Sequence, residues 1–244
     1  HACDLPPSNE SPNFPVDVIF TWVNGTDASH LLNLQQTRDE YFAKRTFLHG
    51  KSNSFAGDST ASNRFRDHHE LRYAMRSVAI NAPWVRTIFL VTADTNQIPF
   101  WLKKNTSSRK KDSVHKSPEV VVVHHADFFP KETINQGALP TFNSNAIETY
   151  LHLIPNLAEH FIIMNDDFFF TKPIQKSQLF NEKGYPLVSF QFDWGIISKK
   201  PPTGHRATMG YIWASYNIDR LLDKKFVTEK RYRLLHQAIP MVSI

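Results

Sequence analysis

The strongest pattern along the chain is a series of short, nearly unbroken apolar runs rich in β-branched and aromatic residues. They occupy residues 16–23, 86–93 and 119–125, and a fourth begins at Phe161 and leads to Asp167. Such runs, apolar throughout, are typical of strands buried on both faces of a parallel sheet. The pattern therefore predicts four buried strands.

Helical periodicity fills the intervals between the strands. It predicts helices over residues 31–48, from Ser62-Asn63 to Ala82-Pro83, and to about residue 153 with Asn143 or Ser144 as the cap. Strands that alternate with helices predict an α/β fold with a mainly parallel, Rossmann-like sheet flanked by helices. Beyond Pro173 the pattern weakens to one strand over residues 189–197 and one helix over residues 211–223.

Length and composition favour one sizeable core. The chain has 244 residues, of which 41% are hydrophobic. We expect residues 1–15 to form an irregular lead-in and residues 16–244 a single catalytic α/β domain, with residues 176–244 as a subdomain of it. No apolar run reaches the roughly 18 residues of a membrane span. Because the chain opens at His1 rather than Met, we expect a processed piece, with room for a membrane anchor outside it.

Charge and cysteine content exclude several classes. Cys3 is the only cysteine, which rules out an internal disulfide and a cysteine-based zinc site. The net charge is +5, but the basic residues gather in two separate clusters, at residues 103–116 and 224–233. A nucleic-acid binder usually presents one continuous basic stripe with interleaved aromatic residues, so we expect no nucleic-acid partner. The positive charge favours small molecules that carry phosphate.

The most chemically suggestive stretch is Asn165-Asp166-Asp167, which follows the fourth predicted strand. Ligands of open α/β sheets bind at the carboxyl ends of the strands. Neighbouring residues on a strand point to opposite faces, so the two aspartates can share a metal ion only if the backbone turns there. A hard divalent ion such as Mg²⁺ or Mn²⁺, carrying substrate phosphates, would offset their charge. The alternative is a solvated turn in which Asp166 caps the next segment.

A second charged group accompanies the second predicted helix. Asp67 and Glu70 are three residues apart, and Arg72 and Arg76 are four apart, so each pair can share a helix face. Ordinary surface ion pairing would explain such pairs, at about 0.2–0.5 kcal/mol each. Arginine is, however, the preferred side chain for phosphate, because its planar fork binds two oxygens.

Two further segments suggest binding or structural roles. The first strand ends in Asn24-Gly25-Thr26, a turn where nucleotides often bind, but it lacks the glycine-rich fingerprint of dinucleotide and P-loop proteins. The helix capped by Asn143 or Ser144 would offer backbone N–H groups to an anion or a sugar hydroxyl. The pair His124-His125 is more typical of a structural role than of metal binding.

Several motifs together resemble the Stealth family of sugar-1-phosphate transferases. That family includes bacterial capsule-polymer enzymes and the catalytic subunit of the lysosomal-enzyme N-acetylglucosamine-1-phosphotransferase. Residues 17–27 resemble its first block. Motifs spread in matching order resemble its second block: Arg64-Phe65-Arg66-Asp67, Glu70-Leu71-Arg72-Tyr73, Ala82-Pro83-Trp84-Val85-Arg86, Leu139-Pro140-Thr141-Phe142-Asn143-Ser144 and Asn165-Asp166-Asp167. His236 with Pro240 resembles the start of the third block, and a fourth block is missing, which indicates a fragment or a divergent member.

The resemblance implies a nucleotide-sugar donor, typically UDP-linked, and a glycan hydroxyl as acceptor, with UMP released. It implies Mg²⁺ or Mn²⁺ held by Asp166 and Asp167. The catalytic residues that it implies are His236 as general base, Arg72, Asp67 and Asp17. The donor-binding residues that it implies are Asn24, Arg64, Glu70, Asn143 and Ser144. Within these sets, Arg72 and Arg64 would take phosphate oxygens, and Asp17 and Asn24 would contact the nucleotide. Asp67 and Glu70 would orient the arginines or the acceptor.

Two other functions fit the same residues. A metal-dependent glycosyltransferase would use similar paired acids but would release UDP. A catalytically silent nucleotide-sugar or glycan-binding domain would fit the missing block. The compartment would be the Golgi lumen or secretory pathway in a eukaryote, where the sequons at Asn24 and Asn105 become relevant, and the cytoplasmic face in a bacterium. Nothing in the sequence indicates an oligomeric state.

Overall fold

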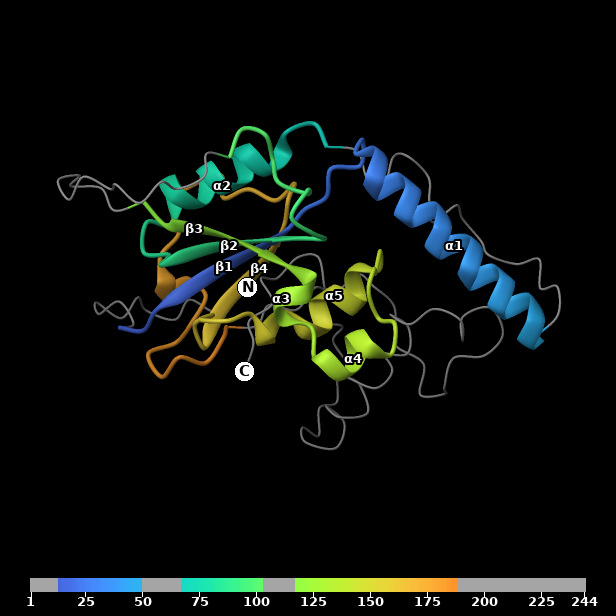
Figure 1. The fold of residues 1–244 in the computed structure, drawn as a ribbon. Helices are drawn as coiled ribbons and strands as arrows, with labels where there is room; N and C mark the ends of the chain where they lie inside the picture. Colours follow the sequence, from blue (N-terminus) through green and yellow to red (C-terminus); the bar gives the residue numbers. More distant parts are fainter. Residues whose placement is uncertain (1–12, 50–66, 103–116, 188–244) are drawn as a thin grey trace, which may run out of the picture.

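A computed structural model describes residues 13–49, 67–102 and 117–187. Within them, four strands form a single sheet: β1 (Val16–Thr21), β2 (Thr87–Thr92), β3 (Glu119–His124) and β4 (His160–Asn165). Their order is β3-β2-β1-β4, and every neighbouring pair is parallel (Figure 1). The α/β fold with a parallel, Rossmann-like sheet is therefore confirmed. The strand expected at residues 189–197 and the helix at 211–223 lie outside the described residues.

Both faces of the sheet are buried along β1 and β2, as the unbroken apolar runs predicted, whereas most residues of the edge strand β3 are half-buried. Along β1, Val18 and Phe20 belong to one core, whereas Ile19 belongs to a second core on the other face. Alternate side chains of a strand point to opposite faces, so a strand between two cores is apolar on both faces along its middle. The two cores have different covers. The first lies under α2, and the second lies under the helices that connect β3 to β4.

Helix α2 (Glu70–Asn81) covers the first core. Four buried residues at helical spacing face the sheet: Leu71, Ala74, Met75 and Val78. The predicted end of the helix at Ala82-Pro83 is confirmed, but the predicted start at Ser62-Asn63 is wrong. The helix begins after His69, whose φ of 69° lies in the left-handed region and interrupts helical geometry. Asp67 thus precedes the helix, and residues 62–66 lie outside the described part of the chain.

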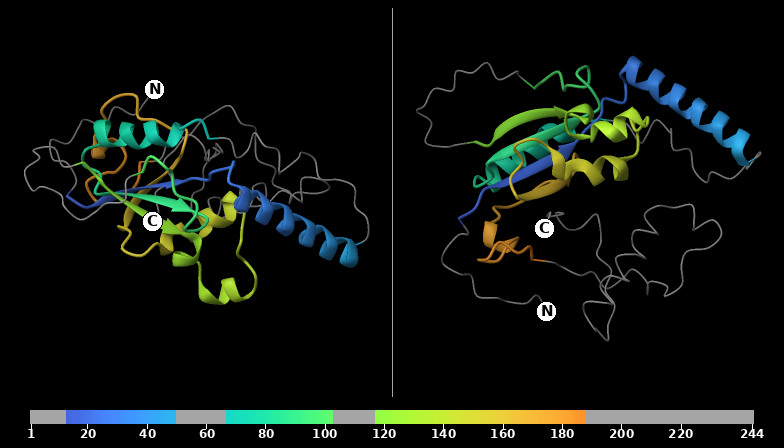
Figure 2. Two further views of the ribbon diagram at one scale, coloured as in Figure 1. Left: turned by 45° about the horizontal axis from the view of Figure 1, so that its top comes forward. Right: turned by 60° about the horizontal axis from the view of Figure 1, so that its bottom comes forward.

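Three short helices cover the opposite face: α3 (His125–Phe128), α4 (Lys131–Asn135) and α5 (Ser144–Tyr150). A 3-10 turn, Leu151–Leu153, continues α5. The predicted cap is confirmed, because the Asn143 side chain accepts a hydrogen bond from the Asn145 backbone N–H at 3.1 Å. Figures 1 and 2 show α2 on one side of the sheet and α3–α5 on the other.

Helix α1 (Ala28–His49) follows Asp27, whose side chain accepts a hydrogen bond from the His30 N–H at 2.7 Å. In both Figures 1 and 2 the helix projects away from the sheet. In its part with described side chains, the buried residues are His30 and Leu34, near the sheet. Among the described residues, no helix has the length and apolarity required to cross a bilayer.

The two histidines at the end of β3 have structural surroundings. His124 Nδ1 lies 2.8 Å from Thr92 Oγ1 of the neighbouring strand, and His125 is buried against the rings of Phe128 and Phe129. Burial, together with the nearby His124, lowers the pKa of His125 to about 4. His125 therefore stays neutral in the folded protein at pH values where an unfolded chain would bind a proton.

We expect this difference to make the fold sensitive to acid. Between pH 6.5 and 4 the unfolded state binds the extra proton, so stability falls as pH falls through this window. From pH 7 to pH 5 the wild type should lose about 2 kcal/mol more than His125→Leu, as measured by urea unfolding at both values. Equal pH slopes for the two proteins would contradict the neutral, buried state of His125.

Candidate functional site

The strand order of the sheet reverses between β1 and β4. β1 leads through α2 to β2 and then β3 on one side, whereas β4 lies on the other side of β1. The carboxyl ends of β1 and β4 meet with Thr21 opposite Asn165. In open α/β sheets, the crevice outside the carboxyl ends at such a switch point is where ligands bind.

Hydrogen bonds fix the segment before α2 at this point. Trp22, which follows β1, donates from Nε1 to Asp67 Oδ2 at 3.1 Å. The other oxygen of Asp67 accepts from the His69 backbone N–H at 2.7 Å. A side-chain oxygen of Glu70 accepts from the His68 N–H. Asp67 is therefore held beside the end of β1, and Glu70 follows three residues later at the start of α2.

The backbone turns directly after β4, which confirms the condition that the sequence set for the two aspartates. The Phe168 N–H donates to the Asn165 carbonyl oxygen at 3.0 Å, so Asp166 and Asp167 occupy the bend. Burial raises the pKa of Asp166 to about 6, and the negative charges of Asp167, Asp67 and Glu70 add to the effect. These four carboxylates, hereafter the acidic cluster, come from two segments far apart in sequence, and the other three act on Asp166.

Glu70 differs from Asp166 in its protonation. Desolvation favours its neutral form, but hydrogen bonds from backbone N–H groups and the nearby His68 outweigh this and lower its pKa. The acidic cluster therefore contains one carboxylate held in its charged form and one, Asp166, that takes up a proton near neutral pH. Within the described residues, no three His, Cys, Asp or Glu side chains are grouped so as to hold a metal ion by themselves.

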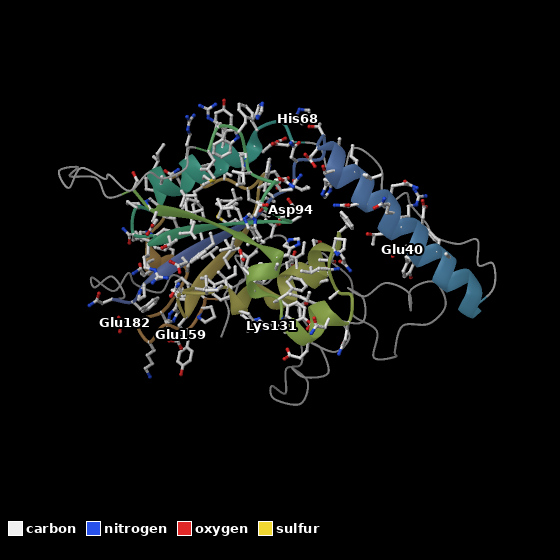
Figure 3. The ribbon with its side chains drawn as sticks, in the orientation of Figure 1. Glu40, His68, Asp94, Lys131, Glu159 and Glu182 are labelled. Carbon is white, nitrogen blue, oxygen red and sulfur yellow. The ribbon has the colours of Figure 1, made fainter. Side chains whose placement is uncertain are left out.

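Asp17 requires a correction. It lies near the amino end of β1, opposite Phe161, and so at the far end of the sheet from Asp166. Its carboxylate is fully buried and forms an ion pair with Arg86; the N–H groups of Thr87 (3.2 Å) and Ala158 (2.7 Å) also donate to it. Figure 3 makes the separation visible, because Glu159 and Glu182 lie toward this end, whereas His68 and Asp94 lie toward the other. The position expected for Asp17, in contact with a nucleotide beside Asp166, is wrong.

Asn24 lies at the carboxyl edge, as expected, but sequence reasoning missed the residue that holds it. Its N–H donates to Gln97 Oε1 at 2.7 Å, while its own Oδ1 accepts from the N–H and hydroxyl of Thr26. Gln97 is buried in the turn after β2, and Gln97 Nε2 has no hydrogen-bond partner among the described residues. The sequence did contain a signal for Gln97, because it is a polar residue shortly after a buried strand. The carboxyl ends of parallel strands lie at the same edge of a sheet, so such a residue is expected near Asn24.

The remaining predicted site residues divide into three groups. Arg72 lies on the exposed side of α2, in the same turn as Glu70. Asn143 and Ser144 are exposed on the α3–α5 side of the sheet. The adjacent Phe142 ring lies 5.2 Å from that of His30, which places them near the start of α1. Arg64 and His236 lie outside the described residues.

Fold and site together define an open α/β protein with a carboxylate-lined switch point. Residues 14–41 match Stealth protein CR1, conserved region 1, and residues 64–188 match Stealth protein CR2, conserved region 2. The chain belongs to the Stealth family. All four members of the acidic cluster fall inside the second match.

Similar proteins carry names from capsule synthesis. The chain is 37% identical to the capsular polysaccharide phosphotransferase fcs1 of Haemophilus influenzae over 229 residues, covering 93% of this chain and 54% of that protein. It is 35% identical to cps1A of Actinobacillus pleuropneumoniae, with coverage of 93% and 54%, and 33% identical to SacB of Neisseria meningitidis serogroup A, with coverage of 90% and 34%. The chain thus spans between a third and just over half of the length of these relatives.

Proposed function

We propose that this chain forms the donor-binding part of a sugar-1-phosphate transferase. The enzyme moves a sugar-1-phosphate from a UDP-sugar, UDP-N-acetylglucosamine or a close analogue, to a hydroxyl of a glycan and releases UMP. The acidic cluster at the switch point carries the proposal. Family membership supports it, because the relatives are named as capsular polysaccharide phosphotransferases.

The acidic cluster suits a divalent cation, Mg²⁺ or Mn²⁺. Mg²⁺ commonly takes one or two protein carboxylates and fills its remaining positions with water and substrate phosphate. A site with two protein ligands is compatible with the lack of any three-ligand group among the described residues. Asp166 and Asp167 would hold the ion, because both lie in the turn after β4 and the charge of Asp167 acts on the carboxyl of Asp166. The ion would neutralise charge on the donor diphosphate.

The reaction that we propose is an in-line displacement at phosphorus. The acceptor hydroxyl oxygen attacks the phosphorus that carries the sugar, and a new P–O bond forms. The bond from that phosphorus to the bridging oxygen breaks, and UMP leaves with this oxygen. The hydroxyl proton passes to a general base, for which His236 is our choice because a histidine pKa lies near working pH.

The other predicted residues would bind and orient the substrates. Arg72 and Arg64 would hold non-bridging phosphate oxygens with their planar forks. Asn24 would contact the nucleotide from the end of β1, on the loop that Gln97 holds. Asn143 and Ser144 would bind donor hydroxyls or phosphate at the start of α5. Asp67 and Glu70, both fixed by backbone N–H groups, would orient the arginines or the acceptor.

The identity of the released nucleotide tests the proposal. The full-length protein is incubated with a panel of UDP-sugars, a glycan acceptor and Mn²⁺, and the nucleotides are separated by chromatography. UMP in amounts equal to the sugar transferred is the expected result. UDP would show glycosyl transfer instead. Saturable UDP-sugar binding without any nucleotide release would show a binding domain.

A further inference from the structure

Exposed rings and an arginine lie beside the acidic cluster on a surface that the proposed reaction leaves without a role. We call it the ring–arginine surface, and it consists of His69, Tyr73, Arg76 and Phe100. Tyr73 and Arg76 lie on the side of α2 opposite to its buried residues. Phe100 comes from the turn after β2, which contacts the start of α2 through its ring.

Phe100 is presented by an anchored turn. The Leu102 N–H donates to the Pro99 carbonyl oxygen at 2.9 Å, and Trp101 and Leu102 pack against the first core. With its neighbours held in this way, the Phe100 ring is 85% exposed. Its described ring neighbour is His69, edge-on at 5.7 Å between centroids. A ring held outward by a packed turn is available for an external partner.

The surface is continuous with the acidic cluster. The His69 N–H donates to Asp67, which is one of the four carboxylates, so Phe100 is separated from the cluster by a single residue. Tyr73 follows one helical turn after His69. The Arg76 guanidinium carbon lies 5.8 Å from the centre of the Tyr73 ring, so charge and ring face the same side. The contacts run from Phe100 to His69 and from His69 to Asp67, while Tyr73 and Arg76 follow on the same exposed side of α2.

We propose that the ring–arginine surface binds the acceptor glycan, with a sugar ring over Phe100 and an anionic group at Arg76. The face of an aromatic ring is negative and attracts the polarised C–H groups of a sugar. A guanidinium fork suits phosphate oxygens. This inference rests on the proposed function, because transfer of a sugar-1-phosphate to a glycan creates a phosphodiester. An acceptor glycan that has already received sugar-1-phosphate units therefore carries both sugar rings and phosphodiester anions. These are the two groups that the ring–arginine surface would bind.

Direct binding, measured without donor, separates this inference from the proposed transfer reaction. The probes are an oligosaccharide joined by phosphodiesters and an oligosaccharide of the same sugars without phosphate, titrated calorimetrically into the full-length protein. Phe100→Ala should weaken binding of both probes by about tenfold, and Phe100→Trp should preserve it. Arg76→Ala should weaken only the charged probe, by about fivefold, and reduce its dependence on salt. Tyr185→Ala is the matched control, since this exposed side chain lies beside the amino end of β4 and should change nothing.

Two results would overturn the inference even if UMP release is observed. Phe100→Leu that binds both probes as tightly as the wild type would show that no ring stacking occurs. A Phe100→Ala protein that melts several degrees lower, with unchanged glycan affinity, would show that another part of the full-length protein covers this ring. Conversely, ring-dependent binding without any UMP release would support this surface while refuting the transfer reaction.

Discussion

Asp167→Ala is expected to lower transferase turnover by roughly 10³-fold while leaving the fold intact. Asp167 is exposed in the turn after β4, so its removal opens no cavity and breaks no buried hydrogen bond. After burial, the charge of Asp167 is the next contribution to the raised pKa of Asp166, and under the proposed function the two carboxylates would hold the ion that carries the donor diphosphate. The measurement is UMP release by the full-length protein at saturating UDP-sugar and varied Mn²⁺. The variant should need far more Mn²⁺ than the wild type.

Glu159→Ala provides the matched control for this loss. Glu159 is also an exposed carboxylate next to β4, but it precedes the strand and so lies at the opposite end of the sheet (Figure 3). If charge at the carboxyl edge is what matters, this variant keeps wild-type turnover and Mn²⁺ dependence. Retained activity in Asp167→Ala would remove the metal role from this residue, and equal losses in both variants would point to a general effect of charge.

The features that the sequence predicted well depend on repeated local signals. Each strand was predicted because the middle positions of a doubly buried strand are apolar on both faces, a signal that repeats over several consecutive residues in each run. The position of Asp166 and Asp167 at the carboxyl edge followed from the same logic, since they come immediately after such a run. The turn that brings them together was stated as a condition, and the bond from Phe168 to Asn165 meets it.

The errors concern residues whose role depends on partners that lie far away in the chain. The start of α2 was misplaced because periodicity does not register a single left-handed residue, His69. Gln97 was missed because its partner, Asn24, is 73 positions away. Asp17 was expected to contact the nucleotide, although its place at the start of a predicted strand puts it at the amino edge of the sheet.

Asp17→Ala is expected to destabilise the fold by about 3–5 kcal/mol, the largest stability effect that we anticipate in the described residues. The substitution leaves two buried N–H groups, of Thr87 and Ala158, without their acceptor, and it removes the partner of Arg86. These bonds connect the first residues of β1 and β2 to the segment that leads into β4. Urea unfolding of the purified protein, followed by circular dichroism, measures the loss.

Two further variants distinguish a structural carboxylate from a catalytic one. Asp17→Asn keeps one acceptor oxygen and should cost less, about 1–2 kcal/mol, so that enough folded protein remains for an assay. Because Asp17 lies at the amino edge, this variant should keep the wild-type KM for the UDP-sugar, whereas a residue in contact with the nucleotide would raise it. Asp39→Ala, which removes an exposed carboxylate bonded to Gln35 on α1, should change stability by less than about 0.5 kcal/mol. A change of under about 1 kcal/mol in Asp17→Ala would contradict the structural role, because an unpaired buried N–H group alone costs at least that much.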